Sequence, residues 1–360
     1  LNALKDRPSL PIPANMRSHR HLTPRVVVAG LAGMSLGLVV AGPSYASVVA
    51  APVTGFSSAD PPAAPLLGCR VSVPAGADLG AAITAAAPST TFCLASGTYH
   101  LARPLVPKAG DAFVGPASAR PVIDASATTY GFDAHKAAGV VFENLVVTGA
   151  TTPGRTACST CGRGIWGGDA MQVFNVAATN NAQDGIGGGD NVTHGWLIVG
   201  SQLTHNGSPG QGFAAAGVKS AKVYTLLNSV VADNIGAGAW CDVGCTGGTW
   251  TIEGNTVANN TAGGIRYEIS NAGAVISDNI VSGNNTSASP GAAGIEIISS
   301  GNALVTRNTI TTSHGPAIRV TNGTNRRRNA YGPNQIIGNT TGGEGVTGCQ
   351  QAGQVCSANH

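Results

Sequence analysis

The chain has 360 residues, of which 51 are Gly and 10% are charged, and its formal net charge is +3. Residues 1–46 hold five Lys/Arg and one Asp, so without them 15 basic residues face 16 acidic ones and the net charge becomes −1. That balance argues against nucleic acid as a partner. The basic run Arg326–Arg328 is interpreted as a solvated loop.

The N-terminal region predicts export. Residues 1–15 are interpreted as an upstream extension and residues 16–46 as a signal peptide, with basic residues, an apolar run over 26–42 and cleavage after Ala46. Residues 47–67 are rich in Ala and Pro and predict a linker. Because the apolar run is short and contains several Gly, we expect a secreted, extracellular protein with no membrane span in its mature form.

A repeated motif occupies residues 68–345. Its best copies are GNTVANNTAGGIRYEIS at 254–270 and the stretch 277–297, and each alternates short apolar segments with Asn or Gly turns. Such a period, with segments too short for helices, predicts one solenoid instead of several domains. The Asn markers, 27, 24 and 29 residues apart, are Asn228, Asn255, Asn279 and Asn308.

The physical form that this repeat favours is a parallel β-helix. Coils of short strands bury their inward residues only when other coils stack on them, at a spacing of about 4.8 Å. Asn suits the turns because it tolerates left-handed backbone angles and can bond to the Asn of the next coil. We expect residues 77–88 to form a short helix that caps the first coil, and residues 346–360 to form a C-terminal tail.

The stretch from about 70 to 340 resembles the right-handed parallel β-helix superfamily of pectate lyases, related polysaccharide lyases and epimerases, and galacturonases. The resemblance begins at the opening AAITAA…FCLASGTYHLARPLVPKAG. The segments AGVK (216–219), GAWCDV (238–243) and GIRYEIS (264–270) resemble a group of bacterial secreted β-helix proteins. The implied fold is all-β: a single-stranded right-handed β-helix with a short N-terminal capping helix.

Eight cysteines in an exported chain indicate disulfides before metal ligands. Their spacing predicts four local pairs, including one across the cap and one in the C-terminal tail. The pairs are Cys69 with Cys93, Cys158 with Cys161, Cys241 with Cys245, and Cys349 with Cys356.

Strand alternation predicts one charged outer face. If Ile265 points inward, Arg266 and Glu268 point outward, and aligning the preceding coil places its polar residues beside them. Asp242 and Glu268 would then lie about 5 Å apart, where two like charges repel by roughly 3 kcal/mol at an effective dielectric of about 20. A bound cation, a basic neighbour or a shared proton would compensate, and each is also a catalytic device. The predicted face comprises Lys219, Trp240, Asp242, Arg266, Glu268 and Glu296.

The favoured function is a polysaccharide lyase that cleaves a uronate-containing polysaccharide by β-elimination. Lys219 is the expected base, Arg266 the ligand of the substrate carboxylate, and Trp240 an exposed platform for a sugar ring. Asp242 and Glu268 are the expected ligands of a Ca²⁺ ion. Glu296, beside Arg266, and Asp184, in a Gly-rich turn, are the further candidates for substrate binding.

Three alternatives stay open on the same fold. In a glycoside hydrolase, Asp242 and Glu268 would be the acid and the nucleophile or base. In a uronan C5-epimerase, Tyr130-Gly-Phe-Asp133-Ala-His135 would matter, because it resembles the Tyr-Gly-Phe-Asp-Pro-His element of mannuronan epimerases with Ala134 in place of the proline. A non-catalytic, glycan-binding surface rod would need neither the Asp242–Glu268 pair nor the Tyr130–His135 element. The turns with Asp169, Asp190 and His194 are a weaker candidate site.

Overall fold

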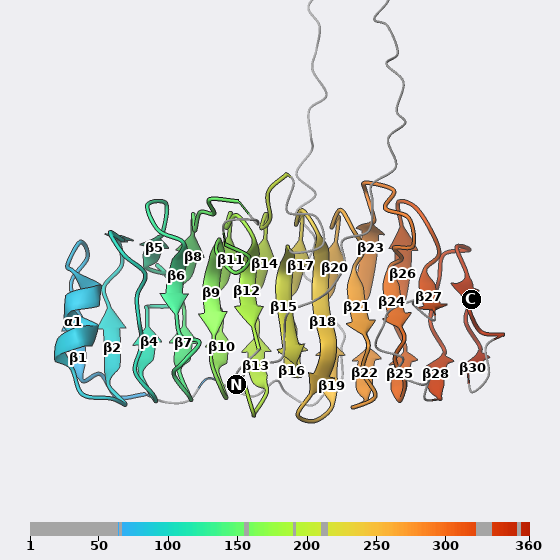
Figure 1. Ribbon diagram of the computed structural model, residues 1–360, viewed down its shortest axis with the longest axis horizontal. Helices are drawn as coiled ribbons and strands as arrows, with labels where there is room; N and C mark the ends of the chain where they lie inside the picture. The colour runs from blue at the N-terminus through green and yellow to red at the C-terminus, as the bar shows by residue number, and fades with distance from the viewer. Residues whose placement is uncertain are drawn as a thin grey trace, which may run out of the picture. The chain divides into compact units, whose positions relative to one another are not determined.

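The computed structural model describes residue 64 and residues 67–154, 158–189, 192–209, 215–321, 333–350 and 354–360. In these residues the chain passes through three parallel sheets in turn, and one short helix lies at the N-terminal end (Figure 1). This is the predicted right-handed parallel β-helix. The predicted upstream extension and signal peptide, and Arg326–Arg328, lie outside the described residues, as does the linker except for Ala64 and Leu67.

Sheet A runs the full length of the described coils. All its pairings are parallel, and each strand adds beside its equivalent in the previous coil. Its strands, in order, are β1 Val71–Val73, β2 Thr91–Leu94, β4 Ala112–Val114, β7 Val141–Glu143, β10 Gln172–Phe174, β13 Trp196–Val199, β16 Tyr224–Leu227, β19 Trp250–Glu253, β22 Ala274–Ser277, β25 Ala303–Thr306, β28 Asn334–Ile337 and β30 Gln354–Ser357.

Sheets B and C complete each coil. Sheet B consists of β3 Thr98–His100, β5 Val122–Asp124, β8 Val146–Thr148, β11 Ala177–Thr179, β14 Gln202–Thr204, β17 Val230–Ala232, β20 Thr256–Ala258, β23 Ile280–Asn284 and β26 Thr309–Thr312. Sheet C consists of β6 Tyr130–Asp133, β9 Arg163–Gly167, β12 Asp184–Gly188, β15 Ala216–Lys222, β18 Ala237–Thr246, β21 Ile265–Glu268, β24 Ile295–Ile298, β27 Ile318–Thr321 and β29 Val346–Thr347.

The cap is the helix α1, Leu79–Ala85. Asp78 accepts a hydrogen bond from the Ala81 N–H at 2.9 Å, which satisfies one of the free donors of the first turn. Leu79 and Ile83 are buried and belong to the main core. The helix is shorter than the predicted 77–88 because the residue before Pro88 avoids the helical conformation.

Buried Asn residues form hydrogen-bonded ladders at two corners of the coil, as the repeat predicted. Asn279 Oδ1 accepts both the backbone N–H and the side-chain amide of Asn255, each at 3.0 Å, and the pattern continues to Asn308. Asn228 was wrongly placed in this ladder. Ser229 occupies that rung, and Asn228 instead takes the left-handed turn position before it, with φ of 48°.

The coils continue into residues 346–360, since β29 and β30 extend sheets C and A. All four predicted disulfides are present, Cys69–Cys93, Cys158–Cys161, Cys241–Cys245 and Cys349–Cys356. None of the helices in the described part of the chain has the length and apolarity needed to cross a membrane.

Candidate functional site

A continuous row of side-chain positions runs along the outside of sheet C, one from each coil. Between its members, inward residues such as Ile165, Val218 and Ile265 are completely buried in the core. The predicted alignment of Lys219, Trp240, Arg266 and Glu296 is confirmed by the strand register. The whole row is Asp133, Trp166, Gly187, Lys219, Trp240, Arg266, Glu296, Arg319 and Thr347.

Trp240 lies at the centre of the predicted cluster, but it is not the exposed platform that the sequence suggested. Only 5% of this residue is exposed. The Lys219 ammonium of the preceding coil lies 3.7 Å from its ring centroid, and the Arg266 guanidinium carbon of the following coil lies 4.8 Å away. Two cations therefore flank the ring, an arrangement stabilised by its quadrupole, and no face is left for a sugar.

Lys219 and Asp242 form an ion pair at the edge of this cluster. Lys219 Nζ lies 3.2 Å from Asp242 Oδ2, and the two side chains are 18% and 26% exposed. Asp242 Oδ1 also accepts the Val243 N–H at 2.8 Å. The Asp242 carboxylate and the Trp240 ring therefore both contact the Lys219 side chain.

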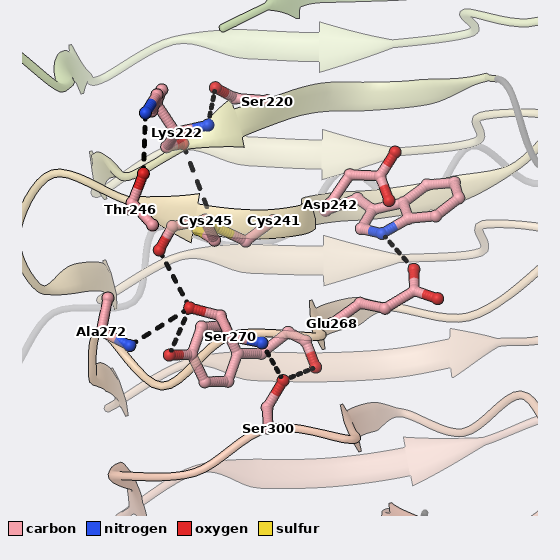
Figure 2. Close-up of a disulfide and its surroundings, with 12 residues drawn as sticks. Ser220, Lys222, Cys241, Asp242, Cys245, Thr246, Glu268, Ser270, Ala272 and Ser300 are labelled. Carbon is pink, nitrogen blue, oxygen red and sulfur yellow. Dashed lines mark hydrogen bonds between the residues drawn. A yellow bond between two sulfur atoms is a disulfide. The ribbon is translucent and has the colours of Figure 1, made fainter. Parts of the chain in front are cut away.

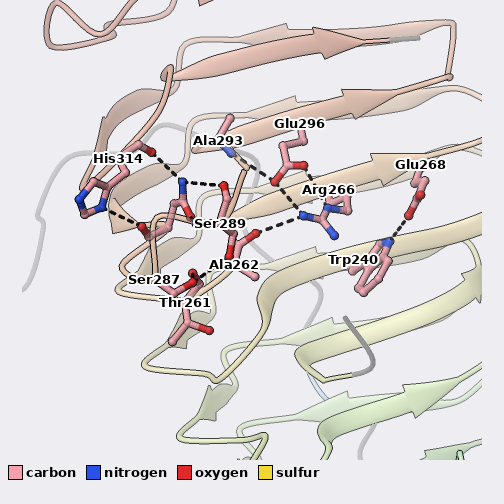
Figure 3. A network of polar contacts seen from close by, with 11 residues as sticks. Trp240, Thr261, Ala262, Arg266, Glu268, Ser287, Ser289, Ala293, Glu296 and His314 are labelled. Carbon is pink, nitrogen blue, oxygen red and sulfur yellow. Dashed lines mark hydrogen bonds and ion pairs between the residues drawn. The ribbon is translucent and has the colours of Figure 1, made fainter. Parts of the chain in front are cut away.

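Glu268 is half-buried on the next coil and faces the same cluster. The indole N–H of Trp240 donates to Glu268 Oε2 at 3.0 Å (Figures 2 and 3). Burial raises the pKa of the Glu268 carboxyl, and the negative charge of Asp242 raises it further. The contribution of Asp242 has the direction expected from two neighbouring carboxylates, although burial of Glu268 is the larger cause.

Arg266 and Glu296 are neutralised by each other. Arg266 Nε and Nη2 each donate to a different Glu296 oxygen at 3.1 Å, and Nη2 also donates to the Ala262 carbonyl (Figure 3). Their side chains are only 7% and 1% exposed. The expected roles of Arg266 as a carboxylate ligand and Glu296 as a substrate contact do not fit this enclosed, bidentate pair.

Asp184 was expected in a turn but begins strand β12 and is fully buried. Its Oδ2 accepts Arg163 Nε and its Oδ1 accepts the Ala216 N–H, both at 3.0 Å. Burial raises the pKa of Asp184 to about 6, although Arg163 and Lys219 oppose the shift. Both carboxyl oxygens are thus engaged within the protein, so Asp184 holds Arg163 and strand β15 in place and does not fit the expected role of a substrate contact.

A second cluster of polar and aromatic side chains lies at the N-terminal end of the row, around the Tyr130–His135 element. His135 Nδ1 is hydrogen-bonded to Asp133 Oδ1, and the His135 ring stacks on Trp166 with centroids 3.9 Å apart. The Tyr130 ring lies 5.0 Å from the same indole, and its hydroxyl contacts Thr160. Trp166 was missed, although the Gly-Ile-Trp of 164–166 matches the Gly-Ile-Arg that placed Arg266.

The turn residues form a separate pair. His194 Nδ1 lies 2.9 Å from Asp169 Oδ2, and Asp169 Oδ1 accepts the backbone N–H groups of Thr193 and His194. Asp190 lies outside the described residues. This pair is largely exposed on the histidine side, so it is the weaker candidate for chemistry.

The donor set does not favour the predicted calcium site. Ca²⁺ takes six to eight oxygen ligands, whereas Asp242 is engaged by an ammonium and Glu268 by an indole N–H. Within the described ranges, no group of three or more His, Cys, Asp or Glu side chains is placed to hold a metal ion. The calcium requirement stays a prediction.

Comparisons with known proteins agree with this fold. The sequence profile described as "Right handed beta helix region" matches residues 214–355. The surface adhesin PfbA of Streptococcus pneumoniae is 13% identical, with 75% of this chain and 78% of that chain covered and a TM-score of 0.52. Pectate lyase Pel9A is 16% identical over 78% of this chain and 73% of its own, with a TM-score of 0.48.

A third similar structure is the A-module of the Azotobacter vinelandii mannuronan C-5 epimerase AlgE6. It is 16% identical over 78% of this chain and 92% of its own, with a TM-score of 0.41. No curated protein sequence matches the chain. The chain is a right-handed parallel β-helix protein, and likenesses at this level of identity bear on the fold alone.

Proposed function

We propose that the protein is a secreted polysaccharide-cleaving enzyme that acts on uronate-containing chains by β-elimination at the outer face of sheet C. The observation that carries the proposal is the cluster of Lys219, Asp242 and Glu268. One ammonium and two carboxyl groups, all partly accessible, lie on three consecutive coils beside Trp240. In a chain with 10% charged residues, such a concentration indicates a reason other than solubility.

The proposed chemistry assigns one role to each group. Lys219, held in place by Asp242, neutralises the substrate carboxylate as negative charge develops on it. Glu268 removes the C5 proton; the electron pair forms a C4–C5 double bond, the C4–O4 bond breaks, and Glu268 returns the proton to O4. The raised pKa of Glu268 makes it a better base than an ordinary carboxylate and a ready donor afterwards.

This assignment differs from the sequence prediction that Lys219 is the base. Lys219 Nζ lies 3.2 Å from Asp242 Oδ2 and 3.7 Å from the Trp240 ring centroid, so the lysine is engaged on two sides, whereas Glu268 is the carboxyl whose pKa is raised. Asp242 then holds Lys219 in place, and its negative charge raises the pKa of the Glu268 carboxyl. The role of Lys219 as the base remains the alternative for the same three residues.

One observation favours hydrolysis as a second candidate. Glu268, with its raised pKa, lies on the coil after the one that carries Asp242. In a glycoside hydrolase, a carboxyl group with a raised pKa serves as the acid and a second carboxyl group as the base or nucleophile. Products distinguish the reactions, because only elimination leaves an unsaturated end that absorbs in the near ultraviolet.

Secretion is part of the proposal. Four disulfides in the described chain suit an oxidising compartment outside the cytosol. The predicted signal peptide over 16–46 points to the same compartment.

A panel of uronate and neutral polysaccharides tests the activity, with ultraviolet absorbance and reducing ends measured with and without a chelator. Elimination predicts both signals together on a uronate polymer, and hydrolysis predicts reducing ends alone. Activity that survives the chelator fits the donor set, whereas activity that requires added Ca²⁺ would restore the calcium prediction. Binding without either signal would make the protein a glycan-binding rod.

A further inference from the structure

The two tryptophans of the sheet C row have different surroundings. Trp240 has a cation from each neighbouring coil against its ring. Trp166 has His135 stacked on it from the preceding coil, but the residue opposite it on the following coil is Gly187, and the next is Gly188. Trp166 is also partly exposed, unlike Trp240. Neither glycine places a side chain against the indole, and the Arg163 guanidinium carbon, from the strand of Trp166 itself, lies 5.7 Å from the ring centroid.

Glycine is required at these two positions. A Cβ atom on Gly187 would lie 2.7 Å from Arg163 Nε and still closer to the Asp184 carboxylate, and one on Gly188 would lie 3.1 Å from Trp166 Cδ1. Gly188 also has φ of 145°, which L side chains rarely adopt. The Arg163–Asp184 pair thus reaches over Gly187, into the interval between Trp166 and Lys219 on the row.

Arg163 brings an unused donor to this interval. The residue is 7% exposed, its Nε is bonded to Asp184, and its Nη1 is buried without a hydrogen-bond partner among the residues that the structure describes. A buried guanidinium donor without a partner is costly, and such groups are rare unless a ligand or ion completes them. The planar guanidinium is suited to a carboxylate, as its geometry with Asp184 already shows.

We propose that the interval over Gly187 and Gly188 is a second sugar subsite, where a uronate ring stacks on Trp166 and its carboxylate accepts a hydrogen bond from Arg163 Nη1. The inference rests on the proposed uronate substrate and extends its binding face. Adjacent members of the row are about 4.8 Å apart, so Trp166 lies about four coil spacings from Arg266 and two from Lys219. The substrate chain then runs along the row, with the subsite on the N-terminal side of the Lys219 cluster.

Two substitutions separate the stacking contact from the carboxylate contact. Trp166→Leu removes the aromatic face, and Arg163→Lys keeps a positive charge beside Asp184 but removes Nη1. Arg307→Gln is the matched control, because Arg307 forms an exposed ion pair with Asp278 away from sheet C. All three are made in a Glu268→Gln background, so that the probe is not consumed by the proposed reaction.

Calorimetry then measures the binding of trisaccharides of galacturonate, mannuronate and glucuronate, and of a neutral galactose trisaccharide. Trp166→Leu should weaken acidic and neutral probes alike by about tenfold, and Arg163→Lys should weaken the acidic probe alone by about tenfold. Arg307→Gln should bind as its parent does. Unchanged affinity in either subsite variant, or a parent that binds none of the acidic trisaccharides, overturns the subsite.

A missing elimination activity can be distinguished from a missing subsite. Ultraviolet absorbance of the same samples without the Glu268→Gln substitution reports cleavage separately. Variants that lose affinity while no polymer is cleaved by the wild type would keep the subsite and remove the enzyme activity.

Discussion

Asp184→Asn tests whether burial or the ion pair with Arg163 decides the energetics of this enclosed carboxyl. The pKa of Asp184 is raised from 3.8 to about 6, because desolvation outweighs the attraction of Arg163 and Lys219. One pKa unit is worth about 1.4 kcal/mol, so the shift corresponds to about 3 kcal/mol. Since the folded protein holds this proton more tightly than the unfolded chain, the contribution is fully present below about pH 3.8 and is lost as pH rises through about 6.

Asn has nearly the same shape as protonated Asp but does not titrate. The free energy of unfolding of Asp184→Asn, minus that of the wild type, should therefore rise by about 3 kcal/mol between about pH 3 and pH 7. Urea unfolding, followed by circular dichroism with the disulfides intact, measures both proteins at each pH. The difference removes the contributions of other titrating groups, and Asp278→Asn, in an exposed pair with Arg307, serves as the control.

The result that would refute this reasoning is a difference that stays flat or falls as pH rises. A fall would mean that the Asp184–Arg163 ion pair outweighs desolvation, and that the pKa of Asp184 is lowered instead of raised. The Asp278→Asn control should change by less than about 1 kcal/mol throughout.

Further predictions concern the cluster and the core. Lys219→Ala and Glu268→Gln should each lower turnover about 100-fold or more, while the free energy of unfolding changes by about 1 kcal/mol or less. The double variant should lose much less turnover than the product of the two single losses. Wild-type turnover in both single variants would move the active site elsewhere. Glu296→Gln should destabilise the fold by about 3–5 kcal/mol, because Arg266 is left as a buried unpaired charge; recovery on replacing both residues by apolar ones checks that cause, and a loss below about 1 kcal/mol contradicts it. Asn279→Ala should cost about 3 kcal/mol or more in urea unfolding, because it leaves several buried ladder groups without partners; near-wild-type stability would show that water replaces the rung.

The fold could be predicted from the sequence because its determinants are local and repeated. A period of 24 to 29 residues sets the coil, and strand alternation around Ile265 correctly placed Arg266 opposite both Trp240 and Glu296. The short spacing of Cys158 and Cys161, and of Cys241 and Cys245, made local pairing the simplest arrangement, so these bridges were also predictable. Even the ladder was recognisable, although Ser229 replaced Asn at one rung.

The tertiary structure decided which side chains a ligand can reach. A residue that points outward from a sheet is still enclosed when ladder neighbours from two coils pack against it, as Lys219 and Arg266 do around Trp240. The sequence cannot reveal this, because those neighbours lie about a coil away and their side-chain directions depend on one another. In the same way, the glycines opposite Trp166 leave one side of its ring without a cross-strand neighbour. Backbone register follows from periodicity, whereas burial and charge pairing follow from side chains that meet only after the coils have stacked.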